Sequence, residues 1–127
     1  MTYYIAKTIS GKFDDVISRV TEALKAEGFG VLTEIDVAAT LKKKIDVDFR
    51  PYRILGACNP KMAYKALSAE DKIGVMLPCN VIVQQTDKGV EVAAVDPVAS
   101  MQAVENPGLG DIAGPVKEAL ARVVNSL

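Results

Sequence analysis

The stretch from Phe13 to Gly28 constrains the fold more than any other part of the sequence. Its apolar residues recur at the spacing of one helical face, and they are Phe13, Val16, Ile17, Val20, Ala23 and Leu24. Asp14 and Asp15 fall in the first turn, where negative charge suits the helix dipole. Gly28 stands where a helix commonly stops. The sequence therefore predicts a long amphipathic helix that must bury one face.

Segments rich in β-branched and aromatic residues predict strands on both sides of this helix. They are 2–9, 29–36, 51–58, 73–86 and 90–96. Pro51 suits the start of the third strand, because it has no backbone N–H to donate to a ladder. The turn residues at 87–89 join the last two strands as a hairpin.

Further helices are predicted between and after these strands. Residues 37–45 form a short amphipathic helix with Lys42, Lys43 and Lys44 on its solvated face. Residues 60–71 form another, because Asn59 is a good N-cap and Pro60 suits the first helical position. Residues 97–104 form one or two helical turns, and 106–111 form a loop. The final helix buries Ile112, Val116, Ala119, Leu120, Val123 and Val124, with Pro115 in its first turn.

The resulting element order is β-α-β-β-β-β-α with short helical inserts. This order predicts an α+β fold with a mostly antiparallel sheet and the two long helices packed on one face. The length of 127 residues fits one domain, 1–127. Apolar residues are slightly over-represented, which favours either a surface covered by a partner subunit or a well-filled monomer core.

The charge distribution excludes several classes of function. The chain carries 15 basic and 16 acidic residues, for a net charge of −1, and so lacks the basic footprint of a nucleic-acid-binding protein. No apolar run approaches the ~20 residues of a membrane span. The N-terminus does not resemble a signal peptide. We therefore expect a cytoplasmic protein that binds neither nucleic acid nor membrane and carries no cofactor.

Two cysteines carry most of the chemical interest. Cys58 and Cys79 are each followed by an asparagine, and the sequence contains no histidine. Cys58 precedes a predicted helix, and a helix N-terminus favours the reactive thiolate. The two are either buried core residues or a functional thiol pair. Their spacing matches no metal-binding pattern, and we predict no metal site. Because two consecutive strands carry them, we expect both side chains on one side of the fold.

The residues around the cysteines complete a candidate ligand site. Asn59 has a structural role as the helix cap. Asn80 is disfavoured inside a strand, so it either holds a backbone group at a bulge or points into a cleft. Arg50 is either part of a solvated basic face or the contact for a small anion. Tyr52 fits the wall of the same cleft or the edge of the core. The candidate ligand-binding residues are therefore Arg50, Tyr52, Cys58, Asn59, Cys79 and Asn80.

The segments ILGACNP (54–60) and LPCNVIV (77–83) resemble a family of small bacterial and archaeal proteins, domain of unknown function 302. The resemblance covers about residues 35–97, and the rest agrees in element order. It implies a TATA-binding-protein-like α+β fold and a homodimer. It implies no activity, and a shared fold does not make the chain a DNA-binding protein.

Three functions remain open at this point. The first is a non-enzymatic dimeric module that binds a small ligand in a cleft near the cysteines. The second is a thiol-dependent enzyme or redox protein that uses Cys58 and Cys79. The third is a purely structural interaction module. Thiol reactivity of the folded protein separates the first two.

Overall fold

The computed structural model describes residues 2–127 and contains a five-stranded antiparallel sheet in the order β1-β5-β4-β3-β2. The strands are β1 (Tyr4–Ile9), β2 (Gly30–Asp36), β3 (Tyr52–Cys58), β4 (Cys79–Thr86) and β5 (Gly89–Val95). The α-helices are α1 (Phe13–Ala26), α2 (Val37–Ile45), α3 (Pro60–Ala69), α4 (Pro97–Ser100) and α5 (Gly110–Asn125). Short 3₁₀ segments are η1 (Asp71–Met76), η2 (Met101–Ala103) and η3 (Pro107–Leu109).

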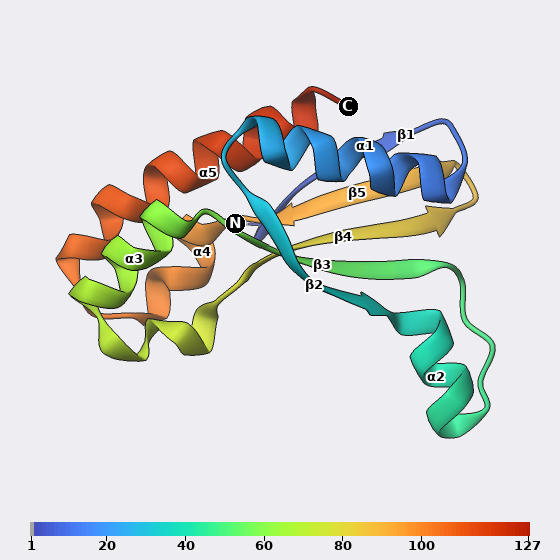
Figure 1. The fold of residues 1–127 in the computed structure, drawn as a ribbon, viewed down its shortest axis with the longest axis horizontal. Coiled ribbons are helices and arrows are strands. Elements are labelled where there is room, and N and C mark those ends of the chain that lie inside the picture. Colours follow the sequence, from blue (N-terminus) through green and yellow to red (C-terminus); the bar gives the residue numbers. More distant parts are fainter. Residues whose placement is uncertain (1) are drawn as a thin grey trace.

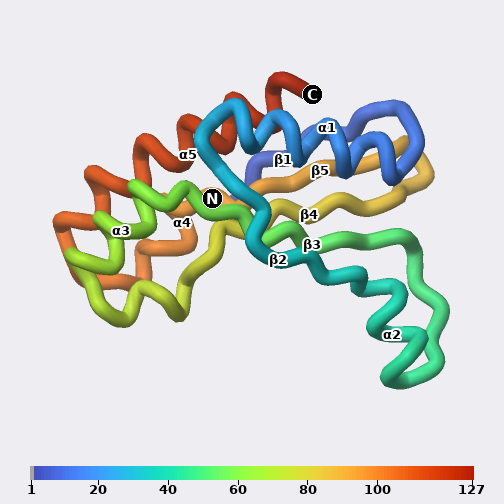
Figure 2. Tube along the Cα trace, viewed as in Figure 1, coloured from blue at the N-terminus to red at the C-terminus, as the bar shows by residue number. Residues whose placement is uncertain are grey.

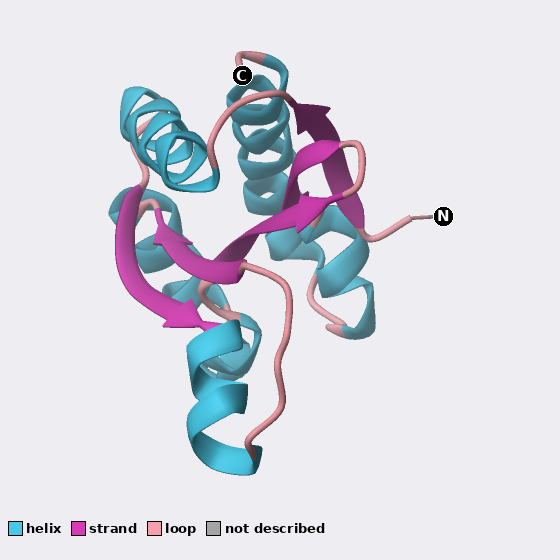
Figure 3. Ribbon diagram, turned by 90° about the vertical axis from the view of Figure 1, so that its right-hand side faces the viewer, coloured by secondary structure: helices cyan, strands magenta, loops and turns pink. Residues whose placement is uncertain are grey.

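The helices lie in three places around the sheet. The long helices α1 and α5 lie side by side on one face, while α3 and α4 gather at one end of the strands (Figure 1). Helix α2 projects from the body near the opposite end, and no helix of the described residues covers the second face of the sheet (Figure 3). This arrangement confirms the predicted α+β class and the packing of two long helices on one face. Within residues 2–127, no helix combines the length and apolarity needed to cross a membrane.

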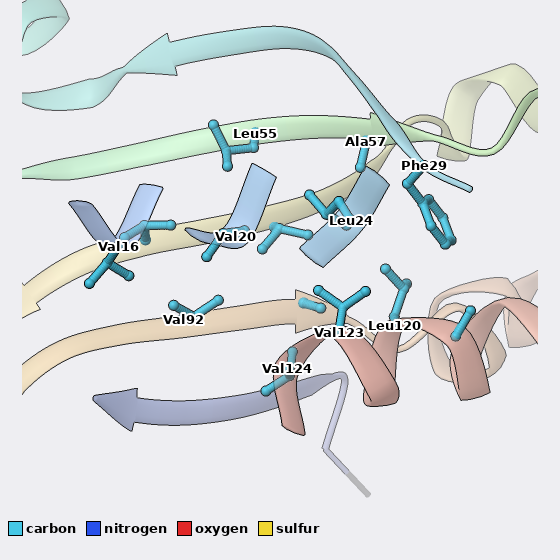
Figure 4. Close-up of a cluster of buried hydrophobic side chains, with 14 of the residues drawn as sticks. Val16, Val20, Leu24, Phe29, Leu55, Ala57, Val92, Leu120, Val123 and Val124 are labelled. Atoms are coloured by element: carbon cyan, nitrogen blue, oxygen red, sulfur yellow. The ribbon is translucent and has the colours of Figure 1, made fainter. Parts of the chain in front are cut away.

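The main core lies between the sheet and the two long helices. Figure 4 shows α1 and α5 directing their apolar faces at side chains of β3 and β5. The fully buried residues include Val16, Val20, Leu24, Leu55, Val92, Leu120 and Val124. The apolar residues that are spaced three and four apart in the sequence therefore lie on one face of each helix, and the sheet covers that face.

The α2 region forms a separate arm. The chain leaves the sheet after β2, forms α2 and returns to β3 through an extended segment (Figure 2). The Asp36 carboxylate caps α2 by accepting a hydrogen bond from the Ala39 amide at 2.9 Å. Asp46 ends it in a left-handed conformation, with φ of 55°. The helix has no buried residue, so little of the protomer holds it in place.

The first correction concerns residues 73–76, which were predicted to begin a strand. They belong to the 3₁₀ segment η1, and β4 begins at Cys79. Ile73 is buried with Ala66 and Leu109 in a small second cluster at the end of the molecule. The apolar character of this stretch therefore serves local packing beside α3, where the chain must turn back before it can enter the sheet.

The second correction concerns the start of the last helix. The predicted loop at 106–111 contains η3, and α5 already begins at Gly110. Pro115 is therefore the sixth residue of α5 and lies beyond its first turn. Asn106 anchors the earlier start: its Nδ2 donates to the Ala69 carbonyl at 2.8 Å, and its Oδ1 accepts from the Gly108 amide at 3.0 Å.

Candidate functional site

An apolar cavity of ≈330 Å³ lies at the end of the sheet where α3 and α4 gather. Its walls come from the end of β3, the start of β4, α3 and the first half of α5. Among the described residues, no charged side chain lines it, and its polar side chains besides the cysteines are Thr33 and Asn59. Leu32 and Leu67 also line it and are 67% and 44% exposed, so they form its rim.

The turn from β3 into α3 positions one wall of the cavity. The Asn59 Oδ1 accepts a hydrogen bond from the Met62 amide at 3.3 Å, and Pro60 takes the first helical position. This confirms the cap predicted from the sequence. The cap and Pro60 fix where the chain leaves β3 and enters α3, four residues of which line the cavity: Met62, Ala63, Ala66 and Leu67.

Close packing over Gly56 shapes a second wall. A Cβ atom at this position would overlap the side chains of Thr33 and Pro78, both of which line the cavity. Gly56 pairs with Thr33 on β2 and with Asn80 on β4. The glycine therefore lets two neighbouring segments close over the strand end, which a larger residue would prevent.

Both cysteines are among the residues that line this cavity. That their side chains lie on one side of the fold stays a prediction. Both are half-buried and reduced. The strand register places Ala57 directly opposite Cys79. Burial and, to a smaller extent, the nearby Cys58 raise the pKa of the Cys79 thiol to about 11. Cys79 is thus a neutral thiol near pH 7 and a poor nucleophile.

The other predicted site residues do not join the cavity. Val81 and Val83 are buried under the helices, so alternation places Asn80 and Ile82 on the uncovered face of the sheet. There Asn80 lines a second hollow with Tyr52. The register through Asn80 is regular, which rules out the predicted alternative of a bulge. The single cleft expected from the sequence is therefore divided between two faces.

Arg50 lies outside both hollows. Its Nε donates to the Gln84 Oε1 at 2.9 Å, and its guanidinium group lies 4.4 Å from the centre of the Phe49 ring. Among the neighbouring basic residues, Arg53 pairs with Glu34 at 2.7 Å and Asp36 at 3.3 Å. Arg53 is therefore paired with carboxylates inside the protomer, whereas Arg50 is exposed and has no carboxylate partner among the described residues. Its contact with a small anion stays a prediction.

Sequence reasoning missed several residues of the cavity wall. The helical pattern of 60–71 indicated that Met62 or Ala63 faces inward, but it did not show that this face borders a cavity. Met101 and Phe29 also line the wall. They come from separate parts of the chain, and no local pattern connects them. Among residues 2–127, no group of three or more His, Cys, Asp or Glu side chains could hold a metal ion.

The antiparallel sheet, with helices on one face and an uncharged cavity at its end, defines a small α+β domain whose cavity resembles a ligand pocket. The family model of "Domain of unknown function DUF302" matches residues 5–127. This chain belongs to the DUF302 family. The match extends well beyond residues 35–97, which carried the resemblance in the sequence.

A solved structure supports the same assignment. The crystal structure of a conserved DUF302 protein from Bacillus stearothermophilus is 30% identical to this chain, with a TM-score of 0.92 and coverage of 98% of both chains. No curated protein matches the chain. The TATA-binding-protein-like architecture implied by the resemblance stays a prediction.

Proposed function

We propose that this protein is a non-enzymatic module that binds a small apolar molecule in the cavity at the end of the sheet. The observation that carries the proposal is a hollow of ≈330 Å³ whose described walls contain no charged side chain. Ligand pockets are typically apolar hollows of this order of size with a few placed polar groups. Protein interiors are otherwise closely packed, so the volume is a feature of the fold.

The polar groups of the cavity favour an uncharged ligand. The Asn59 Oδ1 is engaged with the Met62 amide, while its Nδ2 has no hydrogen-bond partner among the described residues. Thr33 also lines the wall. A carboxylate or ammonium would lose its hydration here without gaining an opposite charge. An apolar body with one hydrogen-bond acceptor, such as an alcohol, ketone or ester, fits best.

A neutral fluorescent probe, N-phenyl-1-naphthylamine, tests this proposal by its increase in fluorescence on binding. We expect saturable 1:1 binding that long-chain ketones reverse. Ala113 lines the cavity, so Ala113→Leu should weaken binding by about tenfold or more by filling it. The matched control is Ala26→Leu at the exposed end of α1. Absence of binding, or equal binding by wild type and Ala113→Leu, would reject the proposal.

We also propose that the module is a homodimer whose partner covers the α2 arm and the uncovered face of the sheet. The accessible surface is 7570 Å², whereas a monomer of 13.6 kDa is expected to expose about 6,600 Å². The excess of about 1,000 Å² is comparable to the ~800 Å² that each partner buries in a standard interface. Exposed apolar residues on and beside the arm include Ile35, Ile45, Val47 and Phe49.

Sedimentation velocity tests the dimer. We expect a dimer at tens of micromolar protein and a shift to monomer on Ile45→Asp, since a charge in an apolar interface is costly. Val75→Asp is the matched control, because Val75 is 85% exposed on η1 at the other end of the molecule. A single species of monomer mass in the wild type would reject the dimer. If only the control variant dissociates the dimer, the α2 arm is not its interface.

A thiol-dependent enzyme or redox protein is the second candidate function. The observation in its favour is that Cys58 and Cys79 line one cavity. The raised pKa of Cys79 opposes it, because only the thiolate is nucleophilic. Labelling of the native protein with iodoacetamide decides between the two. Faster alkylation of Cys58 than of a model thiol near neutral pH supports the thiol function, whereas inert cysteines before unfolding would end it.

A further inference from the structure

An apolar row crosses the uncovered face of the sheet. Strand pairing aligns one residue from each strand at the same level of the ladder, and from β2 to β1 these are Ile35, Ile54, Ile82, Ala93 and Ala6. Their neighbours in β3, β4 and β5 are buried under the helices. Alternation therefore directs the row to the face that no described helix covers (Figure 3).

This face carries almost no charge. Among the strand residues that the structure describes, Glu91 is the single charged side chain on it, and its Oε1 accepts a hydrogen bond from the Gln84 Nε2 at 2.8 Å. The solvated face of an antiparallel sheet is normally polar. A patch that is apolar and poor in charge is instead typical of the centre of a protein interface.

The apolar row has large residues on one side and small residues on the other. Strand β4 is the middle strand of the sheet and carries Ile82, with Ile54 on the β3 side and Ala93 on the β5 side. A two-fold axis along β4 would place β3 of one protomer over β5 of its partner. Ile54 would then face the partner's Ala93, and large and small side chains that face each other let two layers interdigitate.

A two-fold axis across the strands would give a poorer fit. It would place Ile54 over its own copy and Ala93 over its own copy. The first contact would be crowded and the second would leave a gap, and both cost stability in a packed layer. The distribution of residue sizes therefore favours the axis along β4.

The next level of the ladder has complementary charges about the same axis. Tyr52, Gln84 and Glu91 are paired across β3, β4 and β5. Arg50, which precedes β3, donates from its Nε to the Gln84 Oε1 at 2.9 Å. The positive charge thus lies on the β3 side of Gln84 and the negative charge on the β5 side. An axis along β4 brings Arg50 toward the partner's Glu91, so opposite charges meet.

We propose that the uncovered sheet faces of two copies pack together about a two-fold axis along β4, with Ile82 on the axis and Ile54 against the partner's Ala93. This inference rests on the homodimer proposed above and assigns its interface. Packed sheets lie about 10 Å apart at an angle of about 30°, so the pairs nearest the axis keep these positions best. A face of about 20 Å by 20 Å supplies roughly half of the ~800 Å² that each partner buries. The α2 arm supplies the rest.

Exchanging the two residue sizes tests the axis, with the dimer dissociation constant measured by sedimentation velocity over a dilution series. Ile54→Ala should weaken the dimer by about a hundredfold, because each dimer loses two contacts. Ala93→Ile should weaken it by at least about tenfold through overpacking. The double variant should return to within about tenfold of the wild type, because large again faces small. Since β4 separates Ile54 from Ala93 within a protomer, no contact inside one chain explains such a rescue.

A charge at the axis gives a second test. Ile82→Asp places two carboxylates together and should dissociate the dimer, whereas the exposed Val75→Asp should not. A monomeric wild type rejects the homodimer itself. A dimer that withstands Ile82→Asp but dissociates on Ile45→Asp keeps the homodimer and overturns the sheet-face interface.

The size exchange also decides the axis separately from the interface. Tighter dimerisation of Ala93→Ile, or a double variant no tighter than Ile54→Ala, would overturn the axis along β4. Both substitutions keep the face apolar, so this test stays informative even if Ile82→Asp unfolds the protomer.

Discussion

The two ends of the sheet contain the same kinds of residue and differ in how they are filled. Under α1 and α5, Leu24, Leu120 and Val124 are completely buried. At the other end, Met62 and Leu77 are half-buried around a hollow of ≈330 Å³. Apolar residues are therefore not lacking at the cavity. The hollow lies where α3, the start of β4 and the first half of α5 meet, beyond the main core.

The largest effect should come from the filled end. Leu120→Ala removes a side chain with no exposed surface from the centre of the core. We expect the free energy of unfolding to fall by about 2–5 kcal/mol, measured by urea denaturation. Leu67→Ala on the cavity rim, where Leu67 is 44% exposed, is the control and should cost much less. Similar losses of unfolding free energy at the two positions would show that the two ends of the sheet are packed equally well.

Helix α5 offers a site for a small-to-large substitution both in the main core and at the cavity. Ala119 belongs to the main core, whereas Ala113 lines the cavity, and both lie on α5. Ala119→Leu should destabilise the protein by about 1–3 kcal/mol through overpacking. Ala113→Leu should change stability by less than about 0.5 kcal/mol, because the added methylenes enter the hollow. Thermal and urea unfolding of the pair would show the difference, and equal costs would mean that the cavity wall is rigidly filled.

The sequence predicted the elements that carry their own local signals. The bounds of α2 agree with the predicted 37–45, and the Asn59–Pro60 start of α3 was correct. The strand predicted at residues 73–76 was wrong because an apolar stretch of β-branched residues has the same composition in a buried turn as in a strand. Ile73 packs against Leu109, far along the chain, and a local pattern cannot record that contact.

The candidate site was predicted in part for the same reason. Cys58, Asn59 and Cys79 line one cavity because they stand at the adjoining ends of two consecutive strands. Tyr52 and Asn80 lie on the uncovered face. Successive residues of a strand face opposite sides of the sheet, so a shift of one residue in the predicted strand changes the face to which each residue is assigned. Met101 reaches the cavity through the tertiary packing of η2, which leaves no trace in its neighbouring sequence.

Asp96 tests what holds the cavity end together. It is 7% exposed; its Oδ1 accepts from the Val98 and Ala99 amides at 3.0 and 3.3 Å, and its Oδ2 lies 3.0 Å from the Lys117 Nζ. Burial alone would raise the pKa of this carboxyl, but the Lys117 ammonium and the two amides hold it below its ordinary value. The pair ties α4, next to the cavity, to α5.

Asp96→Asn should therefore lower the free energy of unfolding by about 1.5 kcal/mol at pH 7. Because the folded-state pKa is depressed, this contribution is complete above about pH 4 and disappears as the pH falls toward the folded-state pKa. Urea denaturation between pH 7 and pH 2 should show that the free energy of unfolding falls less at low pH in the variant than in the wild type. Asp87→Asn, in the exposed hairpin turn, should leave this pH dependence unchanged. If Asp96→Asn has the same pH dependence as the wild type, Asp96 is not the group that causes it.

The smallest effect concerns Asn59, which serves both as a cap and as part of the cavity wall. Asn59→Ala removes the acceptor for the Met62 amide and should cost about 1 kcal/mol in urea denaturation. Asn59→Asp keeps a good cap, so stability should stay near that of the wild type. However, it places a carboxylate in an uncharged wall and should weaken binding of N-phenyl-1-naphthylamine. If Asn59→Asp binds the probe as well as wild type, Asn59 does not border the ligand, and its role is confined to starting α3.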